Sequence, residues 1–156
     1  MQIIETSILI QAPVERVWTI LTEVDNYRNW NPFIIDASGQ LVAGQKIQFH
    51  KVEHGGAIPH QSMVTVFNAE NHSLCWTTTW IHALFFKTMN SFNLEAIDEE
   101  SAYLIQVESQ QGLLSILSLP SMLNSLRSSM VSMNKALKRQ AEDKKHRLPH
   151  SWSNGA

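Results

Sequence analysis

The segment between Leu119 and about Lys144 constrains the fold more than any other part of this 156-residue chain. Placed at about 100° per residue, its apolar side chains fall on one stripe roughly 100° wide, as in an amphipathic α-helix. Pro120 suits the first turn, and basic residues gather near the last turns, where they meet the negative end of the helix dipole. The stripe consists of Leu119, Met122, Leu123, Leu126, Met130, Met133, Leu137 and Ala141. We expect a large apolar surface to cover all of it.

The residues before this helix predict one strand, two short helices and then six strands. Alternation of apolar and polar residues predicts the first strand over residues 4–12, and helical spacing predicts a helix over residues 14–22. A second short helix is expected to begin near Asp25 and to end before Pro32. The six later strands are predicted, between turn signals, at residues 33–37, 46–53, 60–69, 74–82, 86–97 and 102–110.

Short turns between consecutive strands favour antiparallel pairing, so we expect a sheet of seven antiparallel strands. Curling this sheet around the long helix buries the apolar face of each. Because one helix does not fill a strongly curved sheet, a cavity is expected between them. The predicted architecture is an α+β helix-grip domain over residues 1–145, followed by a flexible tail over residues 146–156.

Charge and composition argue against several classes of protein. The formal charge of −2 and the isoelectric point near 6.4 do not indicate a nucleic-acid surface. The first residues lack the pattern of a signal peptide, and no apolar run approaches the ~20 residues that cross a bilayer. We therefore expect a cytoplasmic protein without membrane insertion, and the sequence does not indicate its oligomeric state.

The single cysteine and the seven histidines form no metal-binding or nucleophilic pattern. Cys75 alternates with Trp76 on a predicted strand, so it is expected to face away from the cavity as a small buried hydrophobe. His50, His54 and His60 are scattered, with no cysteine or carboxylate at ligand spacing. We expect neither a metal nor another cofactor.

Six stretches of the chain, in their order, match those of a known superfamily. They are ILIQAPVERVW (8–18), YRNWNPF (27–33), GQKIQF (44–49), LCW (74–76), SFNLE (91–95) and LKRQAE (137–142). Together they resemble the helix-grip proteins of the START/Bet v 1-like (SRPBCC) superfamily, in particular its polyketide cyclase/dehydrase-like branch of small bacterial proteins. The resemblance implies a deep apolar cavity that takes a hydrophobic small molecule. It is compatible with lipid and sterol carriers and with aromatase/cyclase enzymes.

Strand alternation selects the side chains expected to line that cavity. Apolar walls with a few hydrogen-bonding groups are typical of sites for small ligands. The expected lining consists of Phe49, Trp76, Trp80, Phe92 and Met130, with Asn90, Gln106 and Glu108 as its polar minority. Val64 and Val66 are expected on the same inner face. The aromatic side chains would also suit a filled core, and the pattern leaves both interpretations open.

Glu108 is the clearest candidate for chemistry in this set. If it points inward, loss of water would favour its protonated form and make it an acid/base group. A shift of one residue in strand register would instead place it in water. We predict binding or transport of a hydrophobic or amphipathic small molecule, such as a lipid or a polyketide-like compound. The alternative is a polyketide cyclase/dehydratase-type enzyme in which Glu108 acts as the acid/base group.

Overall fold

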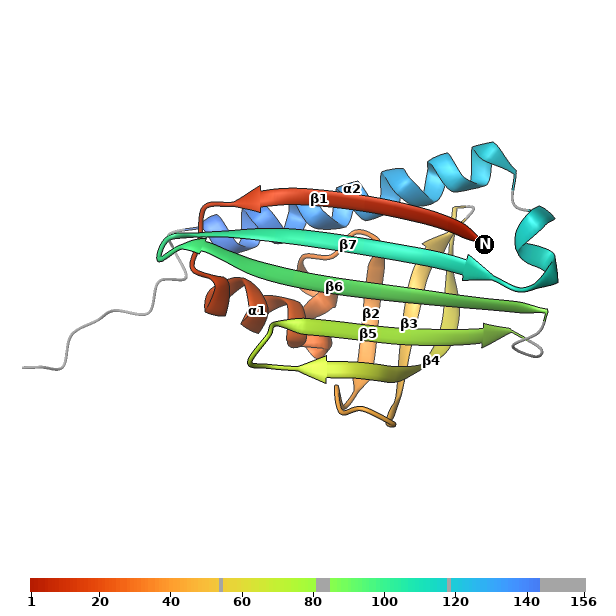
Figure 1. The fold of residues 1–156 in the computed structure, drawn as a ribbon, viewed down its shortest axis with the longest axis horizontal. Helices are drawn as coiled ribbons and strands as arrows, with labels where there is room; N and C mark the ends of the chain where they lie inside the picture. The colour runs from red at the N-terminus through yellow and green to blue at the C-terminus, as the bar shows by residue number, and fades with distance from the viewer. Residues whose placement is uncertain (54, 81–84, 118, 144–156) are drawn as a thin grey trace, which may run out of the picture.

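One antiparallel sheet of seven strands curves around a long helix, in the strand order β1-β7-β6-β5-β4-β3-β2 (Figure 1). The computed structural model describes residues 1–53, 55–80, 85–117 and 119–143. Its elements are β1 (Gln2–Ile10), α1 (Val14–Thr22), the 3₁₀ helix η1 (Val24–Asn29), β2 (Ile34–Gly39), β3 (Lys46–Glu53), β4 (Gly56–Asn68), β5 (Ser73–Trp80), β6 (Phe86–Asp98), β7 (Ser101–Gln111), the 3₁₀ helix η2 (Leu113–Leu117) and α2 (Pro120–Glu142).

The predicted element order and the helix-grip architecture are confirmed. Helix α1 and strand β3 have the predicted bounds, and the other predicted elements differ only at their ends. The short helix η2 is an addition, since its run of apolar residues has no clear periodicity. The expected tail over residues 146–156 lies outside the described residues, as do His54 and the end of the strand predicted over residues 74–82.

A β-bulge corrects one expectation about the inner face of the sheet. Val64 pairs with Trp76 and is buried, whereas Val66 pairs with Cys75 and is 45% exposed. One extra residue in a strand shifts the alternation of its side chains by one position. The expectation that Val64 and Val66 share the inner face is therefore wrong.

Asn31 turns the chain from η1 into β2. Its side-chain oxygen accepts hydrogen bonds from the backbone N–H groups of Phe33 and Ile34, at 2.9 Å in each case. The side chain is buried, so these bonds are shielded from water. This part of the YRNWNPF stretch therefore positions the chain at the start of β2.

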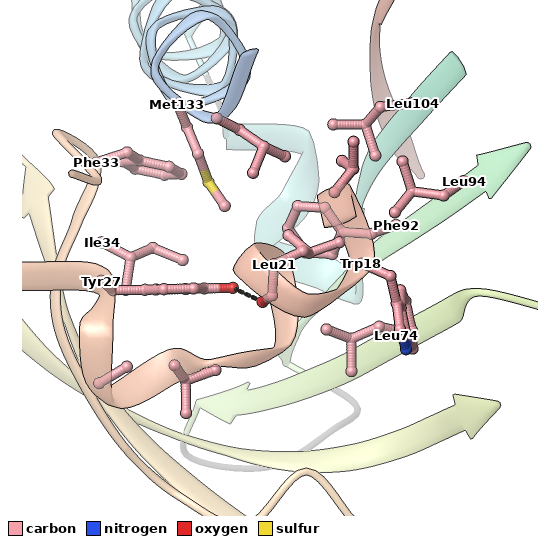
Figure 2. Packing of buried hydrophobic residues seen from close by; sticks show 14 of the residues in the cluster. Trp18, Leu21, Tyr27, Phe33, Ile34, Leu74, Phe92, Leu94, Leu104 and Met133 are labelled. Carbon is pink, nitrogen blue, oxygen red and sulfur yellow. Dashed lines mark hydrogen bonds between the residues drawn. The ribbon is translucent and has the colours of Figure 1, made fainter. Parts of the chain in front are cut away.

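Tyr27 anchors η1 in the core. Its ring is buried beside Ile34, and its hydroxyl donates a hydrogen bond of 2.6 Å to the carbonyl oxygen of Leu21 (Figure 2). Burial raises the pKa of the Tyr27 phenol well above its ordinary value near 10. Ionisation of Tyr27 is therefore disfavoured in the folded protein.

The stability of the protein should fall as the pH rises above about 10, because the unfolded chain then releases the Tyr27 proton more readily than the folded chain. Tyr27→Phe should cost about 1 kcal/mol near neutral pH, where the hydrogen bond to Leu21 is lost. That difference from the parent protein should shrink above about pH 10. Urea unfolding near pH 8 and near pH 10.5 measures both effects, with Tyr103→Phe as the control. A difference that stays constant over this range would rule out Tyr27 as the source.

Helix α2 is buried unevenly along its length. Its second half packs into the core through Met130, Met133 and Leu137, whereas Leu119 and Met122 near its start are 60% and 45% exposed. The expectation that the whole apolar stripe is covered is therefore wrong for the first turns. The physical reason at Met122 is that this side chain lines a cavity, described below, which lies beneath this part of the helix.

The other end of α2 is tied to the start of the chain. The Arg16 side chain of α1 donates hydrogen bonds of 2.6 and 3.0 Å to the carbonyl oxygens of Ala141 and Asp143. The backbone N–H of Gln11 donates a bond of 2.7 Å to the carboxylate of Glu142. The two Arg16 bonds satisfy carbonyl oxygens that a helix leaves open at its C-terminal end, and the Gln11 bond holds the Glu142 side chain. Figure 1 shows the resulting arrangement, in which α2 runs beside β1.

Candidate functional site

A cavity of about 170 Å³ lies between the sheet and the first half of α2. Side chains from β3, β4, β6, β7 and α2 contribute to its walls. The apolar lining consists of Phe33, Val52, Phe86, Met122, Leu123 and Leu126. The polar lining consists of Lys51, His60, Thr88, Glu108, Gln110, Ser125 and Ser129. Apolar walls with several hydrogen-bonding groups are the usual composition of a small-molecule site.

Glu108 lies in the cavity wall at the end of a buried chain of polar side chains. Its side chain is only 3% exposed. It comes from β7, a strand that carries many polar residues. Asn90, its partner in the β6–β7 register, donates a hydrogen bond of 2.9 Å from its amide nitrogen to Glu108 Oε2. Gln106 donates a bond of 3.4 Å to the amide oxygen of Asn90. The structure thus brings together the three polar residues predicted from the sequence.

Lys51 is the buried cation opposite Glu108. Its Nζ lies 3.4 Å from Glu108 Oε2, and its side chain is 5% exposed. The same ammonium lies 5.2 Å from the ring centre of Phe33 and 5.7 Å from that of Phe49, which are cation–π distances. A buried charge is tolerated when it has an oppositely charged partner. Lys51 and Glu108 are oppositely charged partners of this kind.

Lys51 is absent from the site residues predicted from the sequence. The signal that points to it is the alternation in β3, because Ile47 and Phe49 face inward and Lys51 follows at the same spacing. A lysine at an inward position needs a buried partner. Among the predicted inward residues, Glu108 offers the carboxylate.

The Lys51–Glu108 pair has unused hydrogen-bonding capacity. An ammonium has three N–H donors, and within the described residues the Lys51 ammonium makes one hydrogen bond, to Glu108. Glu108 Oε2 accepts the bonds from both Lys51 and Asn90, while Oε1 accepts none from the described part of the chain. Because both side chains line the cavity, a bound molecule can accept a hydrogen bond from Lys51 and donate one to Glu108.

The predicted aromatic residues pack against one another beside the cavity. The ring centres of Phe49 and Trp76 are 5.8 Å apart, and those of Trp76 and Phe92 are 5.1 Å apart. All three rings are buried, as is Met130 on α2. These four side chains belong to the hydrophobic core and are not among those that line the cavity.

Three further residues of the predicted site are Trp80, Asn90 and Gln106. Trp80 ends β5, and its side chain lies outside the part of the structure that is described. Asn90 and Gln106 are buried and do not line the cavity. Asn90 is hydrogen-bonded to Glu108, which does line it, and Gln106 is hydrogen-bonded to Asn90. Of the eight predicted site residues, Glu108 alone is found in the described lining.

Cys75 is buried next to Trp76 and does not contribute to the cavity. Burial raises the pKa of its thiol, which disfavours the nucleophilic thiolate. Within the described ranges, no three His, Cys, Asp or Glu side chains are close enough together to hold a metal ion. None of the described helices is long and apolar enough to cross a membrane.

Comparison with known proteins gives a family and a set of similar folds. Residues 1–141 match the family described as polyketide cyclase / dehydrase and lipid transport. No curated protein sequence matches this chain significantly. The Zhui aromatase/cyclase from Streptomyces sp. R1128 is 15% identical, with a TM-score of 0.75 over 94% of this chain and 96% of that one.

Two further solved structures have the same fold. The major latex-like protein 151 from Panax ginseng is 13% identical, with a TM-score of 0.74 over 91% of this chain and 98% of that one. A START superfamily protein from Mycobacterium smegmatis is 15% identical, with a TM-score of 0.73 over 90% and 97% of the two chains. These findings confirm the resemblance to the START/Bet v 1-like superfamily.

Proposed function

Because the chain belongs to the polyketide cyclase/dehydrase and lipid transport family, we propose that it binds a hydrophobic or amphipathic small molecule in the cavity beneath α2. The observation that carries the proposal is the composition of this cavity. Phe33, Phe86 and Leu126 offer apolar surface, and the buried Lys51–Glu108 pair offers polar contacts on the same walls. Apolar walls supply affinity in such sites, while a few fixed polar groups set the orientation of the ligand.

An enzyme of the cyclase or dehydratase type is the second candidate. Glu108 favours it, because this carboxylate lies in the cavity wall with one oxygen free of hydrogen bonds from the described residues. A general acid or base must lie within hydrogen-bonding reach of the proton that it transfers. In a binding protein, Glu108 would contact the ligand without changing it.

Filling the cavity from the helix side should abolish binding. Ser129 of α2 lines the cavity, and Ser129→Trp would place an indole in the space that the ligand occupies. Ser128 is exposed and is not part of the lining, so Ser128→Trp is the matched control. We expect the parent protein and Ser128→Trp, but not Ser129→Trp, to carry a small molecule that native mass spectrometry detects and denaturation releases.

Titration with a hydrophobic fluorescent dye provides a second readout of the same variants. Binding that persists in Ser129→Trp would place the ligand elsewhere, and a parent protein that takes neither ligand nor dye would contradict the proposal. Incubating the released molecule with fresh protein then separates the two candidates. An unchanged molecule supports binding alone, whereas a conversion that stops in Glu108→Gln supports the enzyme.

A further inference from the structure

We infer that the ligand is a molecule of one ring with an uncharged hydroxyl group, a simple phenol, and that Lys51 and Glu108 bind this hydroxyl between them. The inference rests on the proposed function and narrows it to a substrate class. It rests on three observations: the volume of the cavity, the zero net charge of the buried Lys51–Glu108 ion pair, and the two open hydrogen-bonding positions of that pair.

The volume of the cavity matches a single ring. A cavity of about 150 Å³ lined by apolar side chains holds one benzene molecule, and the volume here is about 170 Å³. The space is therefore sufficient for a six-membered ring with one or two small substituents. The packed rings of Phe49, Trp76 and Phe92 occupy the adjoining core. A fused polycyclic skeleton or a long acyl chain would have to extend out of this space.

The ring is expected to be aromatic because of the walls around it. Phe33 and Phe86 contribute aromatic side chains to the lining, and Leu123 and Leu126 contribute aliphatic ones. Aromatic rings pair favourably in edge-to-face or offset contacts, in addition to the apolar area that they bury. A flat aromatic ring is also rigid, so its binding costs little conformational entropy.

The buried ion pair disfavours a charged ligand. A ligand carboxylate would attract Lys51 but repel Glu108, and pulling Lys51 away would leave Glu108 as a buried charge without a partner. A ligand ammonium would attract Glu108 but repel Lys51, and would leave Lys51 as the buried charge without a partner. An uncharged group leaves the attraction between Lys51 and Glu108 intact.

Among uncharged groups, a hydroxyl matches both open positions. It accepts a hydrogen bond from the Lys51 ammonium through an oxygen lone pair and donates its own proton to Glu108 Oε1. An ether or a ketone provides only the acceptor, so Glu108 Oε1 would be shielded from water without gaining a donor. The pair therefore distinguishes a phenol from its methyl ether.

Competition against a hydrophobic dye tests this assignment with ligands that share one methyl-substituted ring. The full chain at about pH 7 is titrated with p-cresol, toluene, 4-methylanisole and 4-methylbenzoate, and with 1-dodecanol as the long-chain comparison. We expect p-cresol to bind at least about 10-fold more tightly than the other three single-ring compounds. We expect 1-dodecanol to compete more weakly than p-cresol.

A double variant, Lys51→Met with Glu108→Leu, replaces the ion pair by apolar side chains of similar volume, an exchange that proteins often tolerate. In this variant the preference for p-cresol over toluene should disappear. The matched control is Arg28→Met with Asp36→Leu, which removes an exposed ion pair that is not part of the cavity lining and should keep the preference.

Several outcomes would overturn the inference while the proposed function stands. These are 1-dodecanol competing better than every single-ring compound, equal binding of p-cresol and toluene, tighter binding of 4-methylbenzoate, and a p-cresol preference that survives in the double variant. If neither the dye nor any compound binds, the proposed function fails as well. The measurements on the parent protein decide the ligand class even where the double variant does not fold.

Discussion

Replacing Lys51 by methionine is expected to lower the free energy of unfolding by about 3–5 kcal/mol. The substitution removes the cation next to Glu108 and leaves its carboxylate in a wall where the side chain is only 3% exposed. Asn90 would then be its one remaining hydrogen-bond donor among the described residues. A buried charge without a partner is among the largest destabilising effects of a single substitution. Urea unfolding with linear extrapolation measures the loss.

Two comparisons identify the cause of this loss. Lys46→Met removes an exposed lysine from the same strand and should change the stability by no more than about 0.5 kcal/mol. The double variant Lys51→Met with Glu108→Leu should recover most of the loss, because it leaves no buried charge. A single variant that costs less than about 1 kcal/mol, or a double variant whose cost is the sum of the two single costs, would contradict the assigned pairing.

Phe92→Ala should destabilise the protein by a similar amount, about 3–5 kcal/mol, for a different reason. The Phe92 ring is fully buried and lies 5.1 Å from the ring centre of Trp76. Its removal loses apolar contacts and leaves a hole that the surrounding sheet fills only in part. Phe92→Leu retains most of the volume and should cost less. Urea unfolding gives both values.

Phe86 provides the matched comparison, since it is half-buried in the cavity wall. Phe86→Ala should cost less stability than Phe92→Ala but should weaken the binding of p-cresol more. The two measurements therefore separate a residue of the core from a residue of the site. If Phe92→Ala weakens ligand binding more than Phe86→Ala under conditions where both are folded, Phe92 belongs to the site after all.

The fold could be predicted in detail because its main elements have regular side-chain periods. Pro13 and the spacing of Val17, Trp18 and Leu21 give α1 its bounds, and alternation gives β3 its bounds. The bulge between Val64 and Val66 could not be predicted, because the sequence there continues to alternate while the backbone does not. Local patterns indicate which element forms, and pairing with a neighbour decides where its register shifts.

The candidate site could be predicted only in part. Alternation along β7 groups Glu108 with Leu104 and Gln106, and the structure buries all three. The same rule applied to β3 places Lys51 inward, against the expectation that lysine lies at the surface. Alternation tells which face a side chain occupies. Whether it then lines a cavity or fills the core depends on how the rings of Phe49, Trp76 and Phe92 pack, which no single strand determines.

The two ends of α2 contribute to the structure in different ways. Arg16 and Gln11 hold the C-terminal end, and Met133 and Leu137 pack it into the core. The first turns contribute few buried side chains and cover the cavity instead. Substitutions in those turns should therefore change the shape of the cavity at little cost in stability. Substitutions near the other end should lower the stability of the fold more strongly. Such a division allows the shape of the cavity to be altered by substitutions that leave the side chains of the core unchanged.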